Sequence, residues 1–338
     1  MGGRNRFYQQ LLVGLCVLAV LAGCGSLKAE ETKKSLRIGV SLYRGDDTFI
    51  NNIRGEMENC AKEYEQKHGI KVTLDIQDAK GSQNTQNNQV ERFISLGCDV
   101  MCINPVDRTA ASAMIDKAMT AGIPVVFFNR QPVEEDMDRW DQLYYVGVVA
   151  RESAILQGSI VVDQYRKDPA SLDMNGDGVI SYVMLEGESS HQDSLIRTEW
   201  SIQTLKDGGV PIEKITGGIA NWERSQASAL MEQWLEKYPD MIELVVCNND
   251  DMALGAIDAL ERAGKKNIKL VGIDGTTPGI EAVNAGKMLG TVSADKGKYA
   301  EAIFSLAASK ALGQPVLEEL SLENGKYYWS PQEILTGQ

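Results

Sequence analysis

The chain has 338 residues, of which 43% are hydrophobic and 24% are charged. At roughly 150 residues per domain the length suggests two domains, and the composition excludes fibrous, collagen-like and wholly disordered proteins. The formal net charge is −13, from 34 basic and 47 acidic residues. Because such a surface repels phosphate backbones, we expect no nucleic acid partner.

The first residues have the pattern of an export signal. Arg4 and Arg6 precede an apolar run over residues 11–22, which is too short to span a bilayer as a stable helix. The run ends in Leu-Ala-Gly before Cys24, which resembles the lipobox of bacterial lipoproteins. A core helix with a chance cysteine is the alternative interpretation.

The lipobox predicts a lipoprotein signal peptide over residues 1–23, lipidation of Cys24 and a flexible tether over residues 24–34, which are rich in Ser, Lys and Glu. A diacylglyceryl group places two acyl chains in the membrane, which is enough for stable attachment. We therefore expect the protein outside the cytoplasmic membrane, held to it through the lipid anchor only.

Four cysteines follow the lipobox, in apolar helical or strand stretches: Cys60, Cys98, Cys102 and Cys247. The spacing from Cys98 to Cys102 is not the CxxC of zinc or redox sites, and His68 and His191 are the only histidines. We expect buried free thiols. Disulfides are the alternative for an exported protein.

Short β-branched runs alternate with amphipathic stretches from residue 36 onward, which predicts strands followed by helices. The first series has predicted strands at 36–43, 71–76, 100–103, 124–128 and 144–148, with helices at 50–64, 86–96 and 109–121. Strands separated by helices of this length need crossover connections, so we expect parallel sheets with right-handed crossovers.

A polar stretch over residues 131–142 interrupts this rhythm, and a second series follows. Its predicted strands are 181–185, 242–247, 269–273 and 291–293, with helices at 151–166, 194–206, 224–236, 252–263 and 280–284. The sequence thus predicts an α/β fold of two doubly wound parallel-sheet lobes. Loops at the carboxyl ends of both sheets should carry the ligand groups.

Residues 173–181, DMNGDGVIS, match the first nine positions of a calcium-binding loop. The oxygen ligands would come from Asp173, Asn175, Asp177, the Val179 carbonyl and Ser181. The twelfth position, where a bidentate Glu is expected, is Met184, and a strand pattern follows, so a helix–loop–helix switch does not fit. The missing carboxylate must come from elsewhere. A metal-free surface turn is the alternative.

Polar and aromatic side chains gather on the loops that follow predicted strands: Asp46, Asp47, Phe49, Asn129, Arg130, His191, Asp193, Arg197, Trp222, Asn248, Asn249, Asp250 and Asp274. Carboxylates and amides pair with adjacent hydroxyls, a guanidinium donates in a fork, and aromatic faces cover the C–H faces of a sugar ring. Each residue alone is weak evidence for a ligand site, since an Asp after a strand is usually a helix N-cap. Their joint placement indicates a sugar site.

The chain after the leader resembles the type I periplasmic sugar-binding proteins over nearly its whole length. The resemblance is carried by IGV at 38–40, DDTF at 46–49, PVVFFN at 124–129, YYVG at 144–147, the calcium loop, GESSHQD at 187–193 with Arg197, and NNDDMALGA at 248–256. The calcium loop makes the members that bind galactose and glucose the most similar group.

The resemblance implies two lobes joined by a three-strand hinge, with crossings near Val148, Ser293 and Asn324. The implied lobes are residues 35–148 plus 294–323, and residues 149–293 plus 324–338.

Residue by residue, the resemblance also implies roles in the site. Asp47 corresponds to a carboxylate that takes sugar hydroxyls, and Phe49 and Trp222 correspond to two aromatic plates that sandwich the ring. The remaining polar contacts are Asn129, His191, Asp193, Arg197, Asn249 and Asp274. Glu243 matches the distant bidentate calcium ligand, which would replace the carboxylate absent at Met184.

Two positions depart from the family pattern. Ala294 stands before Asp295 where the family has Asn, so one hydroxyl contact is lost or replaced by water. Ser181 stands where the calcium loop usually presents Gln, and its shorter reach leaves room for a water between its oxygen and calcium.

The resemblance implies a monomeric, lipid-anchored receptor that closes on a monosaccharide of the D-galactose/D-glucose type and delivers it to an ABC importer. A sensor that presents its closed form to a chemoreceptor or histidine kinase uses the same cleft and remains an alternative. An enzyme with His191 and Asp193 as acid and base is a further alternative. A retaining glycosidase needs two carboxylates about 5 Å apart around a glycosidic bond. The resemblance instead assigns these groups to the hydroxyls of one enclosed ring, so we expect no enzyme. A sugar-responsive repressor would need a basic DNA-binding headpiece where this chain has a leader.

Overall fold

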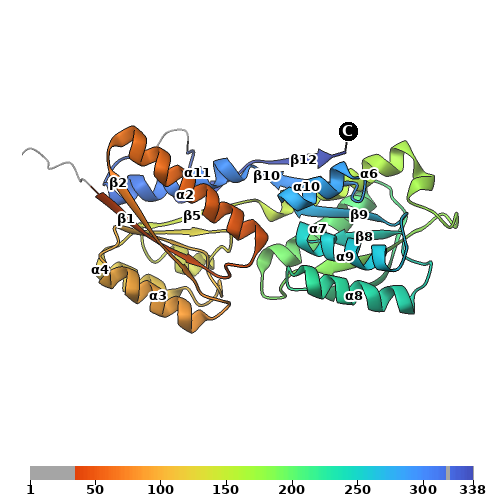
Figure 1. The fold of residues 1–338 in the computed structure, drawn as a ribbon, viewed down its shortest axis with the longest axis horizontal. Helices are drawn as coiled ribbons and strands as arrows, with labels where there is room; N and C mark the ends of the chain where they lie inside the picture. The colour runs from red at the N-terminus through yellow and green to blue at the C-terminus, as the bar shows by residue number, and fades with distance from the viewer. Residues whose placement is uncertain (1–34, 317–319, 338) are drawn as a thin grey trace, which may run out of the picture. The chain divides into compact units, whose positions relative to one another are not determined.

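The structure, a computed structural model, describes residues 35–316 and 320–337. These residues form two α/β units, each built on a six-stranded sheet, which we call the first lobe and the second lobe (Figure 1). The predicted fold class is thereby confirmed. The predicted signal peptide, Cys24 and the tether lie outside the described residues. Within the described ranges, no helix has the length and apolar character needed to cross a membrane.

The first lobe contains the strands β1 (Ser35–Leu42), β2 (Lys71–Asp78), β3 (Val100–Ile103), β4 (Val125–Phe128), β5 (Leu143–Gly147) and β11 (Tyr327–Trp329). Their order is β11-β5-β4-β3-β1-β2, and all neighbouring pairs are parallel. Every residue of β3 and β4 is buried. Strands covered on both faces form continuous apolar runs, as VMCI and VVFF do here.

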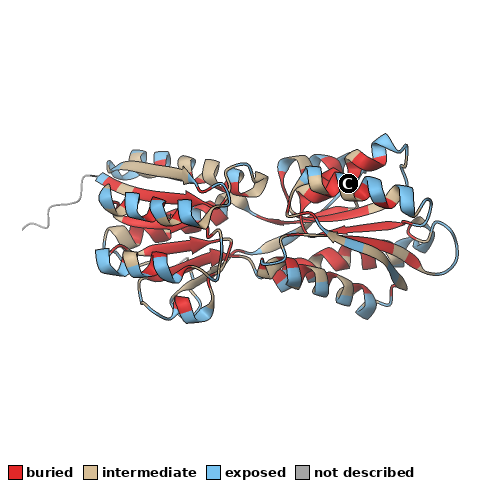
Figure 2. Ribbon diagram, turned by 90° about the horizontal axis from the view of Figure 1, so that it is seen from below, coloured by how far each residue is buried: buried red, intermediate tan, exposed pale blue. Residues whose placement is uncertain are grey.

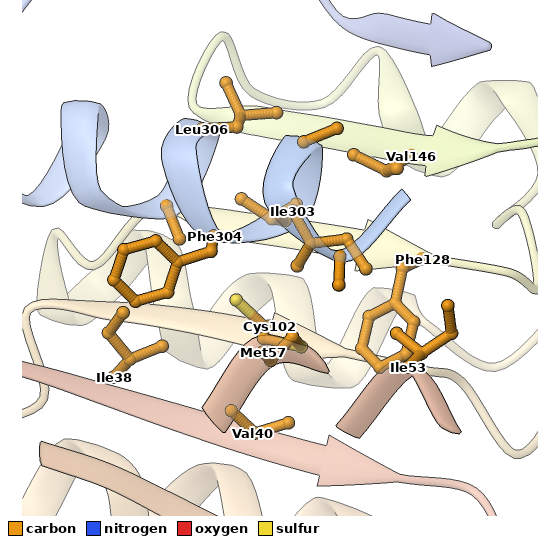
Figure 3. Packing of buried hydrophobic residues seen from close by; sticks show 14 of the residues in the cluster. Ile38, Val40, Ile53, Met57, Cys102, Phe128, Val146, Ile303, Phe304 and Leu306 are labelled. Carbon is orange, nitrogen blue, oxygen red and sulfur yellow. The ribbon is translucent and has the colours of Figure 1, made fainter. Parts of the chain in front are cut away.

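The helices of the first lobe are α2 (Thr48–His68), α3 (Gln83–Ser95), α4 (Ser112–Ala121), α5 (Glu134–Met137) and α11 (Lys296–Ala311). α2 and α11 share one apolar cluster with the sheet, and α3 and α4 share another on its other face. Figure 3 shows Ile53 of α2 and Phe304 of α11 in the same cluster as Ile38 of β1. Asp47 fixes the start of α2, because its Oδ1 accepts a hydrogen bond of 2.9 Å from the Ile50 amide.

The second lobe contains the strands β6 (Ile180–Glu186), β7 (Ile212–Ile219), β8 (Leu244–Cys247), β9 (Lys269–Asp274), β10 (Gly290–Ala294) and β12 (Gln332–Thr336). Their order is β12-β10-β9-β8-β6-β7. β12 runs antiparallel to β10, whereas the other pairs are parallel as predicted. The sheet is therefore mixed at one edge.

The helices of the second lobe are α6 (Ala150–Lys167), α7 (Gln192–Asp207), α8 (Arg224–Lys237), α9 (Asp250–Arg262) and α10 (Thr277–Asn284), with a 3-10 turn, η1 (Pro169–Ser171). α6 and α7 pack on one face of the sheet, and α8, α9 and α10 contribute to a separate apolar cluster. Because helices cover the sheet in both lobes, the strands are largely buried while the outer faces of the helices are exposed (Figure 2).

Several elements of the structure were not predicted from the sequence, and α11 and β7 are the two longest of them. More than half of α11 is buried, so its apolar residues do not form the narrow stripe that marks an amphipathic helix. β7 lies at a sheet edge and has the sequence IEKITGGI, whose glycines and charged residues are unusual in a strand.

The described chain passes between the two sheets at three places. The first passage follows β5 and the second follows β10, near the predicted positions Val148 and Ser293. The predicted third crossing near Asn324 is wrong, because β11 pairs with β5 in the first sheet. The chain crosses at residues 330–331, between β11 and β12. Aromatic packing holds β11 in place, with the Tyr145 and Trp329 rings 5.4 Å apart.

Candidate functional site

Loops of both lobes meet around one cavity. The cavity is lined by all nine residues predicted to bind a sugar: Asp47, Phe49, Asn129, His191, Asp193, Arg197, Trp222, Asn249 and Asp274. Tyr43, Ile50 and Arg130 complete its wall. Most of these residues directly follow parallel strands or begin the next helix. They therefore lie at the carboxyl ends of the strands, where ligands of doubly wound folds bind.

Three of the cavity residues have an unusual backbone conformation. Asn129, Trp222 and Asp274 have φ angles of 62°, 67° and 117°, in the left-handed region that favours glycine. Such a conformation costs about 1–3 kcal/mol and persists where the surrounding structure imposes it. The loops therefore hold these three side chains in directions that an unconstrained chain would not choose.

Arg197 lies between two carboxylates of the cavity. Its Nη1 donates to the Asn248 carbonyl at 2.9 Å and lies 3.5 Å from Asp274 Oδ1, and its Nη2 lies 3.6 Å from Asp193 Oδ2. Burial raises the pKa of Asp193 and of Asp274, and the Arg197 charge opposes both increases. The guanidinium thus favours the ionised carboxylates, which are strong hydrogen-bond acceptors.

Asp47 has both carboxylate oxygens engaged. Oδ1 caps α2, and Oδ2 accepts a hydrogen bond from the Tyr43 hydroxyl. Burial and the neighbouring Asp47 raise the pKa of Tyr43, so the phenol stays protonated and donates. These two bonds fix the plane of the carboxylate, and each oxygen keeps a second lone pair for a ligand.

His191 is a neutral donor into the cavity. Burial, followed by the charges of Arg130 and Arg197, lowers its pKa well below the usual range. Its Nδ1 accepts a hydrogen bond of 3.1 Å from the Asp193 amide, so the proton of the neutral ring is on Nε2. The ring also packs edge to face on Trp222, with centroids 5.1 Å apart.

Several buried donors of the cavity lack a partner. In the described part of the chain, six buried side-chain nitrogen or oxygen atoms form no hydrogen bond, and three of them are Arg130 Nε, Arg197 Nε and Trp222 Nε1. Buried polar atoms are normally satisfied, so a concentration of such atoms calls for an explanation. A solute that brings hydrogen-bond acceptors into the cavity would satisfy them.

Arg130 joins the two lobes, a role that the sequence did not indicate. Its Nη1 and Nη2 donate to the two oxygens of Glu188 at 2.8 and 2.9 Å, and its guanidinium lies 3.7 Å from the centre of the Tyr43 ring. A second pair, Arg44 with Glu223 at 2.7 Å, also links the lobes. The partners are 58 and 179 residues apart, so no local pattern could reveal them.

The predicted calcium ligands come together only in part. Glu243 reaches the loop, where Oε1 accepts from the Met174 amide at 2.7 Å and Oε2 from the Ser181 amide at 2.9 Å. Asp173 accepts from two amides of the loop, those of Gly176 and Gly178. Across residues 35–316 and 320–337, no group of three or more His, Cys, Asp or Glu side chains is arranged as a metal site. The oxygen donors suit calcium, and its binding remains a prediction.

The four cysteines of the described chain are free thiols. Cys98, Cys102 and Cys247 are buried as predicted, whereas Cys60 is only half-buried. Burial raises the pKa of both Cys60 and Cys98 to about 11, so neither thiol is activated for nucleophilic chemistry.

Ala294, the position that departs from the family pattern, ends β10 and is 5% exposed. It packs in the apolar cluster of the first lobe and is not among the residues that line the cavity.

The fold and the cavity define a class of protein, and comparison with known families agrees. The periplasmic binding protein domain family matches residues 38–315, and the chain belongs to this family. Its members bind solutes outside the cytoplasmic membrane and are not enzymes. The predicted resemblance and the expectation of a non-enzymatic, extracytoplasmic binding protein are thereby confirmed.

Individual relatives are similar over most of the chain. The D-galactose/methyl-galactoside binding periplasmic protein of Haemophilus influenzae is 34% identical over 305 residues, covering 90% of each chain. A putative rhizopine-binding protein of Rhizobium meliloti is 34% identical over 254 residues, covering 74% of this chain and 76% of its own. An ABC transporter solute binding protein of Bacillus halodurans with bound myo-inositol is 31% identical, with a TM-score of 0.73, and covers 91% of this chain and 96% of its own.

Proposed function

We propose that the protein captures a monosaccharide of the D-galactose/D-glucose type in this cavity and delivers it to an ABC importer. The observation that carries the proposal is the convergence of carboxylates, amides, a guanidinium and two aromatic side chains around one cavity that also holds three unpartnered N–H donors. A similar protein named for D-galactose and a similar structure with bound myo-inositol, a cyclic polyol, support a polyhydroxylated ring as the ligand.

Different side chains of the cavity would bind different parts of such a ring. Asp47, Asp193 and Asp274 accept hydrogen bonds from hydroxyls, while His191 Nε2 and the Arg197 guanidinium donate to ring or hydroxyl oxygens. Phe49 and Trp222 supply aromatic surface for the C–H faces of the ring. Closure of the two lobes excludes water, which strengthens each of these contacts.

The charges of the cavity also exclude a class of solutes. Three carboxylates face two guanidinium groups, and one of these, that of Arg130, is already paired with Glu188. A further negative charge would therefore meet uncompensated carboxylates in a poorly solvated space. We expect neutral sugars to bind and uronic acids or sugar phosphates to be rejected.

Calorimetric titration of the chain lacking residues 1–24 tests this function. The panel is D-galactose, D-glucose, D-xylose, D-ribose, myo-inositol and D-galacturonate. We expect the tightest binding for galactose or glucose and none for galacturonate. Preference for another member of the panel would contradict the proposed sugar, and absence of binding to every member would contradict the proposed function.

We also propose that the loop over residues 173–181 and Glu243 bind Ca²⁺. An ion that binds only the folded state stabilises it, by about 2.7 kcal/mol at a concentration 100 times Kd. Adding calcium to chelator-treated protein should therefore raise Tm by several degrees in a thermal unfolding scan.

The matched variants for this prediction are Glu243→Gln, which removes the charge that faces the loop, and Asp141→Asn, which removes an exposed charge elsewhere. The shift on adding calcium should be lost in the first variant and kept in the second. An unchanged Tm in the parent protein would contradict the calcium site.

We further propose that Cys24 carries the lipid anchor. In cells that make the full chain, the parent protein should partition into the detergent phase of a Triton X-114 extract, because two acyl chains give stable membrane attachment. Cys24→Ser should move it to the aqueous phase, whereas Cys16→Ser, a cysteine within the predicted signal peptide, should have no effect. Aqueous partitioning of the parent protein would refute the anchor.

A further inference from the structure

A buried carboxylate stands directly behind the cavity. Asp250, the first residue of α9, is fully buried and follows the cavity residue Asn249. Its Oδ1 accepts from the Thr291 hydroxyl at 2.6 Å, and its Oδ2 accepts from the Thr276 amide at 2.8 Å and the Thr276 hydroxyl at 3.3 Å. Within the described residues it takes part in no ion pair with Lys or Arg, and burial raises its pKa to about 7. A buried carboxyl group without a cationic partner is costly to ionise, so its presence calls for a reason.

The fold makes close room for this carboxylate. A Cβ atom at Gly272 would lie 2.3 Å from Asp250 Oδ1, and a Cβ atom at Gly279 would lie 2.2 Å from Oδ2. Neither glycine has a positive φ, so the close contact rather than backbone conformation accounts for both glycines. The carboxylate is therefore enclosed on two sides and has little freedom to move.

The hydrogen bonds of Asp250 lead to the turn that follows Asp274. The Thr276 amide donates to Asp250 directly, and the Gly275 amide donates at 3.3 Å to the Thr291 hydroxyl, which in turn donates to Asp250. These are the two peptide N–H groups immediately after Asp274, whose φ of 117° is the most unusual in the cavity. A strained residue keeps its conformation only when its surroundings impose it.

We propose that Asp250 is a positioning residue: its carboxylate fixes the turn over residues 274–276 and thereby directs the Asp274 side chain toward Arg197 and the bound sugar. The inference rests on the proposed function for the identity of the ligand. Asp250 itself does not line the cavity, so any effect of changing it on binding must pass through a neighbour.

A double-mutant cycle tests this path. The variants Asp250→Asn, Asp274→Asn and the double variant are titrated with D-galactose. We expect Asp250→Asn to weaken binding at least tenfold in the parent protein and by less than about twofold when Asp274 is already replaced, since residues that act through one another are not additive. Equal losses in both backgrounds would overturn the proposal.

Thr291 provides a second route to the same turn. Thr291→Val keeps the shape of the side chain but removes the hydroxyl that links Gly275 to Asp250, whereas Thr291→Ser keeps the hydroxyl. We expect the valine variant to weaken galactose binding and the serine variant to bind nearly as well as the parent. Equal binding by the two would contradict the proposal, and this comparison stands even if Asp250→Asn does not fold.

Amide hydrogen exchange of the ligand-free protein separates this inference from the proposed function. Exchange of the Gly275 and Thr276 amides should be faster in Asp250→Asn than in the parent, while the turn after Asn129 in the first lobe should be unaffected. Unchanged exchange at residues 275–276 would overturn the positioning role. A parent protein that binds no sugar of the panel would refute the proposed function, and the exchange result would still decide the role of Asp250.

Discussion

Replacing Trp222 by alanine is expected to weaken galactose binding by at least tenfold, the largest loss among the aromatic residues of the cavity. The indole is 8% exposed and is held by His191 on one side. A Cβ atom at Gly187 would lie 2.2 Å from the ring, so Gly187 packs directly against it. A buried aromatic plate contributes about 0.5–1.5 kcal/mol beyond its area, and about 1.4 kcal/mol is a tenfold change in Kd.

Calorimetry of three variants checks this expectation. Phe49→Ala should also weaken binding, since Phe49 lines the same cavity from the first lobe. Trp200→Ala is the matched control, because its indole stacks under the Arg151 guanidinium at 3.5 Å, away from the cavity. Binding by Trp222→Ala at the parent affinity would show that the ring does not stack on the sugar.

The second large effect is expected at the ion pair between the lobes, where Glu188→Gln should speed the release of galactose by at least tenfold. The side chain of Arg130 is 5% exposed and that of Glu188 is 22% exposed. Removing one partner of a buried pair costs about 3–5 kcal/mol, and partial exposure of Glu188 reduces this figure. Since the pair joins loops of different lobes, its loss destabilises the closed form.

The pair between Arg44 and Glu223 provides the internal comparison. Its side chains are 23% and 31% exposed, and exposed pairs contribute about 0–1 kcal/mol. Glu223→Gln should therefore change the release rate less than Glu188→Gln, about fivefold at most. Stopped-flow measurement of tryptophan fluorescence gives both rates. Equal effects of the two substitutions would mean that the buried pair has no special role in holding the lobes closed.

The sequence predicted the cavity better than it predicted the contacts behind it. Asp47, Asn129 and Asp274 could be placed because each follows or ends a strand, and the carboxyl ends of parallel strands converge. A lone aromatic such as Trp222 was assigned through the resemblance to known binding proteins. In each case the signal lay in the residue and its immediate neighbours.

The supporting contacts have no such local signal. The hydrogen bonds of Asp250 connect residues 26 and 41 positions apart, and Tyr43 becomes part of the cavity wall through packing under Arg130. The predicted third crossing between the lobes was wrong for the same reason. β11 is three residues long, and its place beside β5 depends on tertiary pairing. Long-range partners of this kind are decided by packing rather than by propensity.

The path of the chain has a consequence for biosynthesis. The core of the first lobe includes Tyr299, Ile303 and Phe304 of α11, and its sheet ends with β11, although the whole second sheet except β12 precedes them in the sequence. Because a ribosome makes the chain from its N-terminus, the core of the first lobe cannot be completed until α11 is made, after most of the second lobe. Until then the apolar face of β1 and α2 stays open to solvent, which exposes the nascent chain to aggregation and to chaperones. The order of synthesis and the order of core completion are thus reversed, and the second lobe can finish most of its packing before the first.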